Sequence, residues 1–235
     1  MKPFRAPGTL VRKHLLLGAL AAFVLAAAAA CPTRPVLEPV PAEVREVAGY
    51  ASLRYERGGS STRVRIAFLI RLPGLGRIEA LGALNTSLFE VRVREPEAVL
   101  IVPSKKAAWR DRRETVLEAG LGFPLGLDEI AALLCGRWGG AADGPFAAWS
   151  FERDASGRVV SGGREGFSFR IEETFAGSGV PRRIKFEADD SAGTISLLRL
   201  EFNRDKPESL YDLDAFPAFA RVTREEMERL LRDED

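Results

Sequence analysis

Few side chains of this 235-residue sequence are suited to catalysis or to metal binding. The sequence contains one histidine, His14, and two cysteines, Cys31 and Cys135. Histidine is the general base of Ser-His-Asp and Cys-His sites and a common zinc ligand. His14 lies in an N-terminal leader that we expect to be removed, so the mature chain should have no histidine chemistry.

The other reactive groups do not form a catalytic pattern. Acidic residues are adjacent at positions 172–173 and 189–190, but neighbours in a strand point to opposite faces, so neither pair makes a two-carboxylate site. The glycine-rich residues 136–144 lack the Gly-Lys-Ser/Thr ending of a phosphate-binding loop. Cys135 lies in the apolar run IAALLCG, where a cysteine behaves as a small hydrophobic residue. We therefore expect no enzyme activity, no metal and no cofactor.

The pattern that does predict chemistry surrounds Cys31. A basic leader precedes residues 15–28, which are almost wholly apolar, and three alanines come directly before Cys31. This indicates a secretory signal, because the apolar run is shorter than the ~20 residues that a spanning helix needs. The motif resembles the lipobox of bacterial lipoproteins, although Ala28 stands where leucine is usual. The resemblance implies that residues 1–30 are a lipoprotein signal peptide and that Cys31 is acylated. A retained membrane anchor and an ordinary cleaved signal are the alternatives.

Acylation would fix where the protein resides, since each buried methylene of a lipid anchor contributes ~0.8 kcal/mol. Pro32 follows Cys31 in place of the aspartate that retains lipoproteins at the inner membrane of enterobacteria. The resemblance therefore implies a lipid anchor at the periplasmic face of the outer membrane. Removal of residues 1–30 leaves 30 basic against 33 acidic residues, a net charge of −3. That balance does not favour nucleic acid as a partner, which requires a clustered basic surface.

The mature chain divides into three segments by composition. Residues 31–46 hold the acylated cysteine and a proline-rich linker, which acts as a semi-rigid spacer. Residues 47–204 form one domain, because a mature chain of about 205 residues is large enough for one core and short for two. Residues 205–235 are a C-terminal extension that begins irregularly and ends in a short charged helix, where Thr223 and Glu226 resemble a capping box.

Alternating apolar and polar residues predict strands throughout residues 47–110 and 146–202. The connections between these strands are short and so join antiparallel neighbours, since a parallel crossover takes a dozen residues or more. Residues 114–136 instead carry apolar residues at helical spacing, and short helices in a meander must bury that stripe on one face of the sheet. The sequence therefore predicts an α+β fold with a curved antiparallel sheet.

One turn of the predicted sheet contains an unexpected leucine. Residues 62–71 alternate as a half-buried strand, and Pro73, Gly74 and Gly76 then mark a turn. Leu75 occupies a position in this turn where a polar residue is usual. Its side chain either folds back onto the core or reaches outward to an apolar surface.

The order of several motifs resembles the LolB family of outer-membrane lipoprotein receptors. The motifs are the lipobox, the spacer, the meander, the PGLG loop at residues 73–76, and the segment GFPLGL at residues 122–127, which leads into an apolar helix ending at Gly136. The extra Gly74 and the C-terminal helix depart from the family pattern.

This resemblance covers about residues 48–202 and implies an incomplete antiparallel β-barrel in which short helices cover an apolar cavity. Receptors of this family accept acylated lipoproteins from a periplasmic LolA-like carrier and insert them into the outer membrane. By this resemblance Leu75 is the membrane-insertion residue. The apolar strand faces that would line the cavity supply Phe68, Ile70, Phe89, Val91, Trp149, Phe151, Phe169 and Ile171. The alternative is a related envelope lipoprotein that binds another lipid or an apolar partner.

Overall fold

The computed structural model describes residue 37 and residues 40–138, 146–189 and 191–232. These residues belong to one folded unit, Leu37–Asp235. The predicted signal peptide and Cys31 lie outside the described residues, so cleavage and acylation stay predictions.

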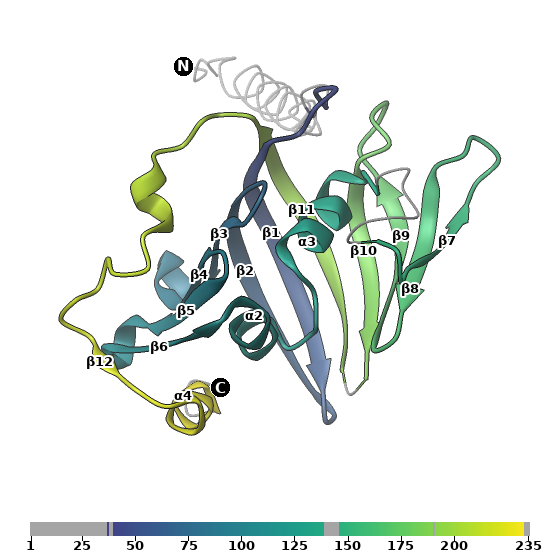
Figure 1. Cartoon of the computed structure of the whole chain (residues 1–235). Helices are drawn as coiled ribbons and strands as arrows, with labels where there is room; N and C mark the ends of the chain where they lie inside the picture. The colour runs from purple at the N-terminus through teal and green to yellow at the C-terminus, as the bar shows by residue number, and fades with distance from the viewer. Residues whose placement is uncertain (1–36, 38–39, 139–145, 190, 233–235) are drawn as a thin grey trace, which may run out of the picture. The chain divides into compact units, whose positions relative to one another are not determined.

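The folded unit is built on a curved sheet of twelve described strands (Figure 1). The strands are β1 (Glu46–Arg57), β2 (Ser60–Arg71), β3 (Leu75–Leu81), β4 (Ser87–Arg94), β5 (Glu97–Val102), β6 (Ala107–Arg112), β7 (Ser150–Arg153), β8 (Val159–Arg164), β9 (Phe167–Thr174), β10 (Pro181–Ala188), β11 (Ser191–Phe202) and β12 (Ala220–Arg221). Their order across the sheet is β12-β6-β5-β4-β3-β2-β1-β11-β10-β9-β8-β7. Only the β12–β6 pair of this described sheet is parallel. The sheet does not close, which confirms the predicted α+β fold with an incomplete barrel.

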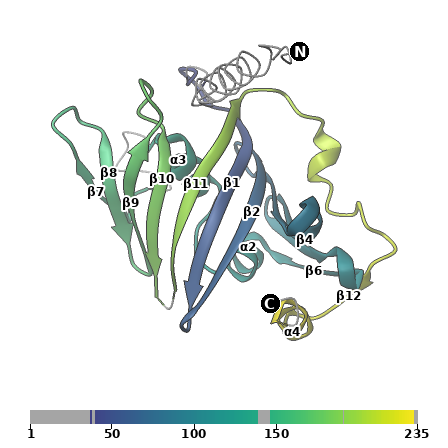
Figure 2. The same cartoon turned by 180° about the vertical axis from the view of Figure 1, so that it is seen from behind.

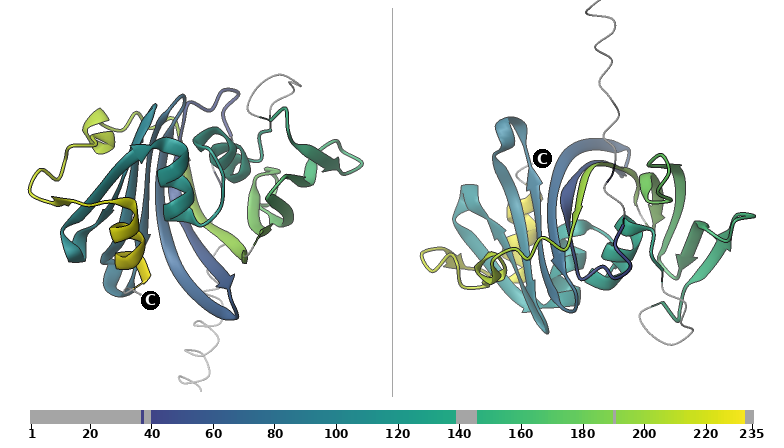
Figure 3. Two further views of the ribbon diagram at one scale, coloured as in Figure 1. Left: turned by 60° about the horizontal axis from the view of Figure 1, so that its bottom comes forward. Right: turned by 90° about the horizontal axis from the view of Figure 1, so that it is seen from above.

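The three described α-helices are α2 (Arg113–Leu121), α3 (Leu127–Cys135) and α4 (Arg224–Arg232). Helices α2 and α3 cover the concave face of the sheet (Figure 3). Helix α2 buries Val116 and Leu117 completely, against β4, β5 and β6. These helices pack on the sheet as predicted, because the concave face is its apolar face and needs a cover.

Two glycines end the covering helices. Gly122 follows α2 with a φ of 78°, and Gly136 follows α3 with a φ of 68°. Glycine adopts this left-handed conformation without a Cβ penalty and commonly stops a helix in this way. Residues 122–126 therefore form a short connection that turns the chain from α2 into α3.

The residues after β11 form a strap around the edge of the sheet, which we call the C-terminal strap (residues 203–232; Figure 2). The strap crosses the convex face, where Tyr211 packs fully buried against Ala48 and Leu69. It then pairs with the edge strand β6 through β12 and ends in α4, whose Met227 is fully buried in the main core. The strap thus completes the core on both faces of the sheet.

Buried charges fasten the strap to the convex face. Glu46 is only 2 % exposed and accepts a hydrogen bond of 2.7 Å from Arg71 Nη2, which also donates to the backbone carbonyl of Lys206. Arg92 Nη1 donates to the Asp212 carbonyl at 2.9 Å. Buried charges of this kind are tolerated only when they are paired, so these arginines specify where the strap lies.

The folded unit also includes the described residues in the second half of the predicted spacer. Leu37, Val40 and Val44 pack against the main core. Arg137 Nη1 donates a hydrogen bond of 2.6 Å to the Ala42 carbonyl, which ties this segment to the end of α3. The described part of the predicted linker thus contributes apolar side chains to the core.

Candidate functional site

An apolar cavity of about 60 Å³ lies between the concave face of the sheet and α3. The sheet wall comes from alternate residues of four neighbouring strands, and the opposite wall from residues 121–135, which we call the lid. All lining residues are apolar: Ala51, Leu53, Ile66, Phe68, Ile78, Leu121, Phe123, Leu125, Ile130, Leu133, Leu134 and Ile195.

Strand register brings the sheet wall together. Ala51 of β1 lies opposite Ile66 of β2, and Leu53 of β1 lies opposite Ile195 of β11. Because side chains alternate along each strand, these residues share the concave face with Phe68. In the lid, Ile130, Leu133 and Leu134 have the i, i+3, i+4 spacing that places them on one face of α3.

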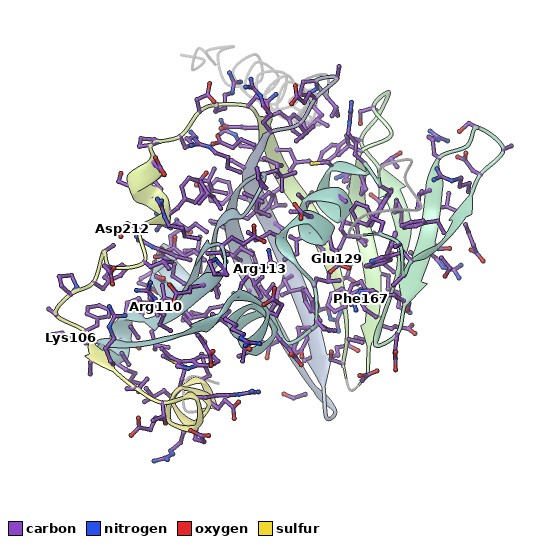
Figure 4. The ribbon with its side chains drawn as sticks, viewed as in Figure 1. Lys106, Arg110, Arg113, Glu129, Phe167 and Asp212 are labelled. Atoms are coloured by element: carbon purple, nitrogen blue, oxygen red, sulfur yellow. The ribbon has the colours of Figure 1, made fainter. Side chains whose placement is uncertain are left out.

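A single carboxylate fastens the lid to the strands beyond β10. Glu129 lies near the start of α3 (Figure 4). Its carboxylate accepts hydrogen bonds from Trp149 Nε1 at 2.7 Å and from Arg164 Nε at 3.0 Å. Its other oxygen accepts from the backbone N–H of Gly126 at 2.8 Å. The Arg164 guanidinium also lies over the Trp149 ring, 5.6 Å from its centroid. We call Glu129, Trp149 and Arg164 the latch.

Aromatic side chains fill the concave face next to the latch. Trp138 stacks on Phe169 with ring centroids 4.6 Å apart, and Trp149 stacks on Phe151 at 5.9 Å. Phe167 stacks on Phe186 at 5.9 Å. Rings at these separations are in contact, so this end of the interior is packed with the protein's own side chains.

The predicted cavity residues therefore separate into groups. Phe68 lines the cavity, whereas the other seven do not. Ile70 belongs to the main core, and Phe89 and Val91 pack there next to Gly120 of α2. The remaining four belong to the packed aromatic end or lie beside it. Their role in ligand binding stays a prediction. Aliphatic lining residues such as Leu53 and Ile195 were missed, although their alternation with polar residues placed them on the same face.

The structure corrects the predicted position of Leu75. This leucine is not at the tip of a loop but is the first residue of β3, paired with Arg71 and Arg94. Its side chain is partly buried and packs against the buried cluster that contains Tyr211 of the C-terminal strap. The turn is shorter than expected because Leu75 and Gly76 continue the ladder with β2, and the strap covers the face to which Leu75 points.

Another leucine protrudes from the folded unit instead. Leu84 lies in the connection between β3 and β4, and its side chain is 97 % exposed. Its backbone is left-handed, with a φ of 59°, which is uncommon for a residue with a Cβ atom. Arg65 Nη1 holds the neighbouring Asn85 through a hydrogen bond of 2.8 Å to Oδ1. The loop therefore presents an apolar side chain to solvent on a fixed base.

Cys135 lies buried in α3, as the sequence predicted. Burial raises the pKa of its thiol to about 12, so the thiol stays protonated and unreactive at neutral pH. Within the described ranges, no group of three or more histidine, cysteine or acidic residues is placed to hold a metal ion.

None of the helices in the described part of the chain is both long enough and apolar enough to span a membrane.

Comparison with known proteins gives the fold. No protein-family model and no curated protein matches the sequence. A LolA superfamily protein from Nitrosomonas europaea has a similar structure, with a TM-score of 0.51, 13 % identity, and 75 % of this chain and 93 % of that chain covered. At that identity the similarity shows that the two chains share a fold.

Two further solved structures are similar over comparable lengths. A DUF1329 family protein from Desulfovibrio piger has a TM-score of 0.49 and 8 % identity, with 74 % of this chain and 92 % of that chain covered. A putative outer membrane lipoprotein-sorting protein domain from Vibrio parahaemolyticus has a TM-score of 0.48 and 7 % identity, with 73 % and 91 % covered.

Proposed function

We propose that this protein binds lipid acyl chains between its sheet and its lid, and that it does so as a lipoprotein of the outer membrane that accepts other lipoproteins from a periplasmic LolA-like carrier. The observation that carries the proposal is the cavity, which is lined only by apolar side chains and covered on one side by a short lid. The fold shared with a LolA superfamily protein supports it. In this proposal acylated Cys31 anchors the protein at the periplasmic face.

The lid must move for an acyl chain to enter. The cavity of about 60 Å³ is far smaller than the roughly 300–1,000 Å³ of ordinary ligand pockets. Displacement of α3 would widen it between the sheet wall and the lid. Movement of α2 would add the predicted residues Phe89 and Val91, since Val91 lies directly under Gly120 of α2. The described structure is then the closed state.

The energetics suit transfer rather than storage. An acyl chain of sixteen carbons gains on the order of 13 kcal/mol when it is fully buried, at ~0.8 kcal/mol per methylene. A bilayer offers a similar gain. An arriving acyl chain must also separate the lid from the sheet, so its binding in the cavity is less favourable than its insertion into lipid. Transfer from the cavity to a membrane therefore lowers the free energy.

Leu84 supplies the membrane contact in this proposal, in the role first assigned to Leu75. Exposing a leucine side chain to water is unfavourable, and its transfer into the apolar part of a bilayer lowers the free energy. Its loop joins β3 to β4, and β3 carries Ile78 of the cavity wall. Contact through Leu84 would bring the strand that forms part of the cavity to the membrane that receives the lipid.

The proposal is tested by native mass spectrometry of the full-length protein purified from membranes. We expect acylation of the N-terminal peptide at Cys31 and a co-purifying lipid on the folded protein. An Ile66→Trp variant, which fills the cavity, should lose that lipid, whereas Leu198→Trp on the exposed outer face should retain it. A folded wild-type protein that carries no lipid and binds no fluorescent fatty acyl probe would contradict the proposal.

The alternative function is that of a related envelope lipoprotein which binds another lipid or an apolar partner. Transfer of a radiolabelled lipoprotein from a purified carrier to lipid vesicles separates the two. Transfer that depends on this protein supports the receptor, and acyl binding without transfer supports the alternative.

A further inference from the structure

Tyr55 places a hydroxyl group without a hydrogen-bond partner beside the apolar cavity. Tyr55 lies on the concave face of β1, two residues after Leu53 of the cavity wall. Its side chain packs against the main core, and its hydroxyl oxygen is buried. Among the residues that the structure describes, no donor or acceptor reaches this oxygen.

The hydroxyl group lies at the point where the lid begins. A Cβ atom placed on Gly122 would be 2.6 Å from the hydroxyl oxygen of Tyr55, so the tyrosine fits only because residue 122 has no side chain. Gly122 separates Leu121 from Phe123, and both of these line the cavity. The hydroxyl group therefore lies at the hinge between α2 and the rest of the lid, next to two residues that line the cavity, while Tyr55 itself is not a lining residue.

A buried hydroxyl group without a partner is unfavourable in a native protein. Nearly all buried polar groups are hydrogen-bonded, and leaving one unpaired forfeits the hydrogen bonds that it would make with water. A ligand in the neighbouring cavity is one source of the missing partner, if it carries a polar atom at that end. In such a weakly polar environment the resulting hydrogen bond is stronger than in water.

The composition of the cavity limits what that polar atom can be. All of the lining residues are apolar, so a carboxylate would lose its hydration there without gaining a charged partner. The carbonyl oxygen of an ester or amide is neutral and accepts a hydrogen bond from an O–H donor.

We infer that Tyr55 donates a hydrogen bond to the carbonyl oxygen of a bound acyl chain, and that the cavity prefers acyl esters and amides over free fatty acids and alkyl ethers. This inference rests on the proposed function and narrows its ligand to the linkages by which acyl chains are attached in lipids. Tyr55 binds the carbonyl group of the acyl chain, while the apolar walls of the cavity contact its hydrocarbon part.

A matched pair of probes tests this inference. One is a pyrene-labelled hexadecanoyl methyl ester, and the other is the corresponding hexadecyl methyl ether, which lacks the carbonyl group. Wild-type protein should bind the ester more tightly than the ether. Tyr55→Phe should weaken binding of the ester by about 3- to 10-fold, the value of one hydrogen bond, and leave binding of the ether unchanged. The control is Tyr50→Phe, which removes a hydroxyl group from the exposed face of the same strand and should change neither affinity.

Stability measurements separate a ligand contact from a structural role. The ligand-free Tyr55→Phe protein should unfold at the same denaturant concentration as wild type or at a higher one, because it loses an unpaired hydroxyl group. Equal weakening of both probes, or no change in either, would overturn the inference and leave the proposed function standing. Failure of the wild-type protein to bind either probe would instead contradict the proposed function itself.

Discussion

The indole Nε1 of Trp149 donates a hydrogen bond of 2.7 Å to Oε1 of Glu129, and so joins the strands at one end of the sheet to the helix that closes the cavity. The Glu129 side chain is only 12 % exposed and also pairs with Arg164. A charged group so little exposed depends on its partners, because it has given up most of its hydration. We therefore expect the latch to control how readily α3 leaves the sheet.

Replacing the latch carboxylate should loosen the lid. Glu129→Gln keeps the shape of the side chain but removes the charge, and its amide nitrogen cannot accept from Trp149 or Arg164. We expect the free energy of unfolding to fall by about 1.5–3 kcal/mol, the usual range for hydrogen bonds to a charged group. Hydrogen exchange measured by mass spectrometry should accelerate in α3. Asp128→Asn, one residue earlier in the same helix, is the matched control, and an equal effect there would argue against the latch.

Cys135 offers a chemical reporter of lid opening. Its thiol is buried in α3, so native protein at pH 8 should be alkylated by iodoacetamide at least about 100-fold more slowly than unfolded protein. Mass spectrometry of the peptide that contains Cys135 measures this rate separately from any reaction at Cys31. Glu129→Gln should speed the alkylation, and fast labelling of the wild-type protein would contradict a closed lid.

The raised pKa of Cys135 should make the free energy of unfolding depend on pH. Burial raises the pKa of Cys135 from 9.0 to about 12 in the folded protein. Between these values the unfolded chain releases the thiol proton and the folded chain keeps it, so the stabilising contribution is complete below pH 9 and is lost as the pH rises. Denaturant unfolding at pH 8 and pH 10.5 should therefore show a smaller loss of stability in Cys135→Ala than in wild type. An equal loss in both would contradict this.

Leu84 and Leu75 should respond differently to the same substitution. Leu84→Glu should leave the free energy of unfolding within about 0.5 kcal/mol of wild type, because the side chain is 97 % exposed, and should weaken binding to lipid vesicles. Leu75→Glu should destabilise the fold, because the carboxylate would replace an apolar contact with the strap cluster. Vesicle flotation and denaturant unfolding measure the two effects. Unchanged flotation of Leu84→Glu would remove Leu84 from the proposed membrane contact.

The C-terminal strap should contribute to stability through its last helix. Met227 is fully buried in the main core, so Met227→Ala should lower the free energy of unfolding by about 2–5 kcal/mol. Arg229→Ala, on the exposed side of the same helix, should change it little. Equal stability of Met227→Ala and wild type would show that α4 is dispensable for the core.

Much of the sheet could be predicted from the sequence, because local patterns determine it. Alternating residues gave nearly every strand from residue 46 to 202, and short connections gave their antiparallel order. The helical spacing of Ile130, Leu133 and Leu134 placed α3 against the sheet, and these residues do line the cavity. Apolar residues repeat every two residues in a strand and about every 3.6 residues in a helix, because one face of each strand or helix must be buried.

Contacts between distant segments explain what the sequence did not reveal. The pattern around Leu75 left its direction open and the family resemblance implied that it protrudes, but the strap residue Tyr211 lies in the cluster that it packs against. The aromatic residues Trp149 and Phe151 were assigned to the cavity for their apolar character, yet they pack on one another and on Trp138. Leu84 is exposed in a loop with a left-handed backbone, and no pattern around it indicated this conformation.

The central claim is that an acyl chain lies between the sheet and the lid, and photo-crosslinking tests it most directly. A hexadecanoyl ester with a diazirine near the end of its chain would be irradiated with the full-length protein, and the labelled peptides identified by mass spectrometry. The account predicts labels on Ile66 or Ile195 of the sheet wall or on Leu133 of the lid, and their loss in Ile66→Trp. Labels confined to outer-face residues such as Tyr50 and Leu198, with none in the cavity, would contradict it.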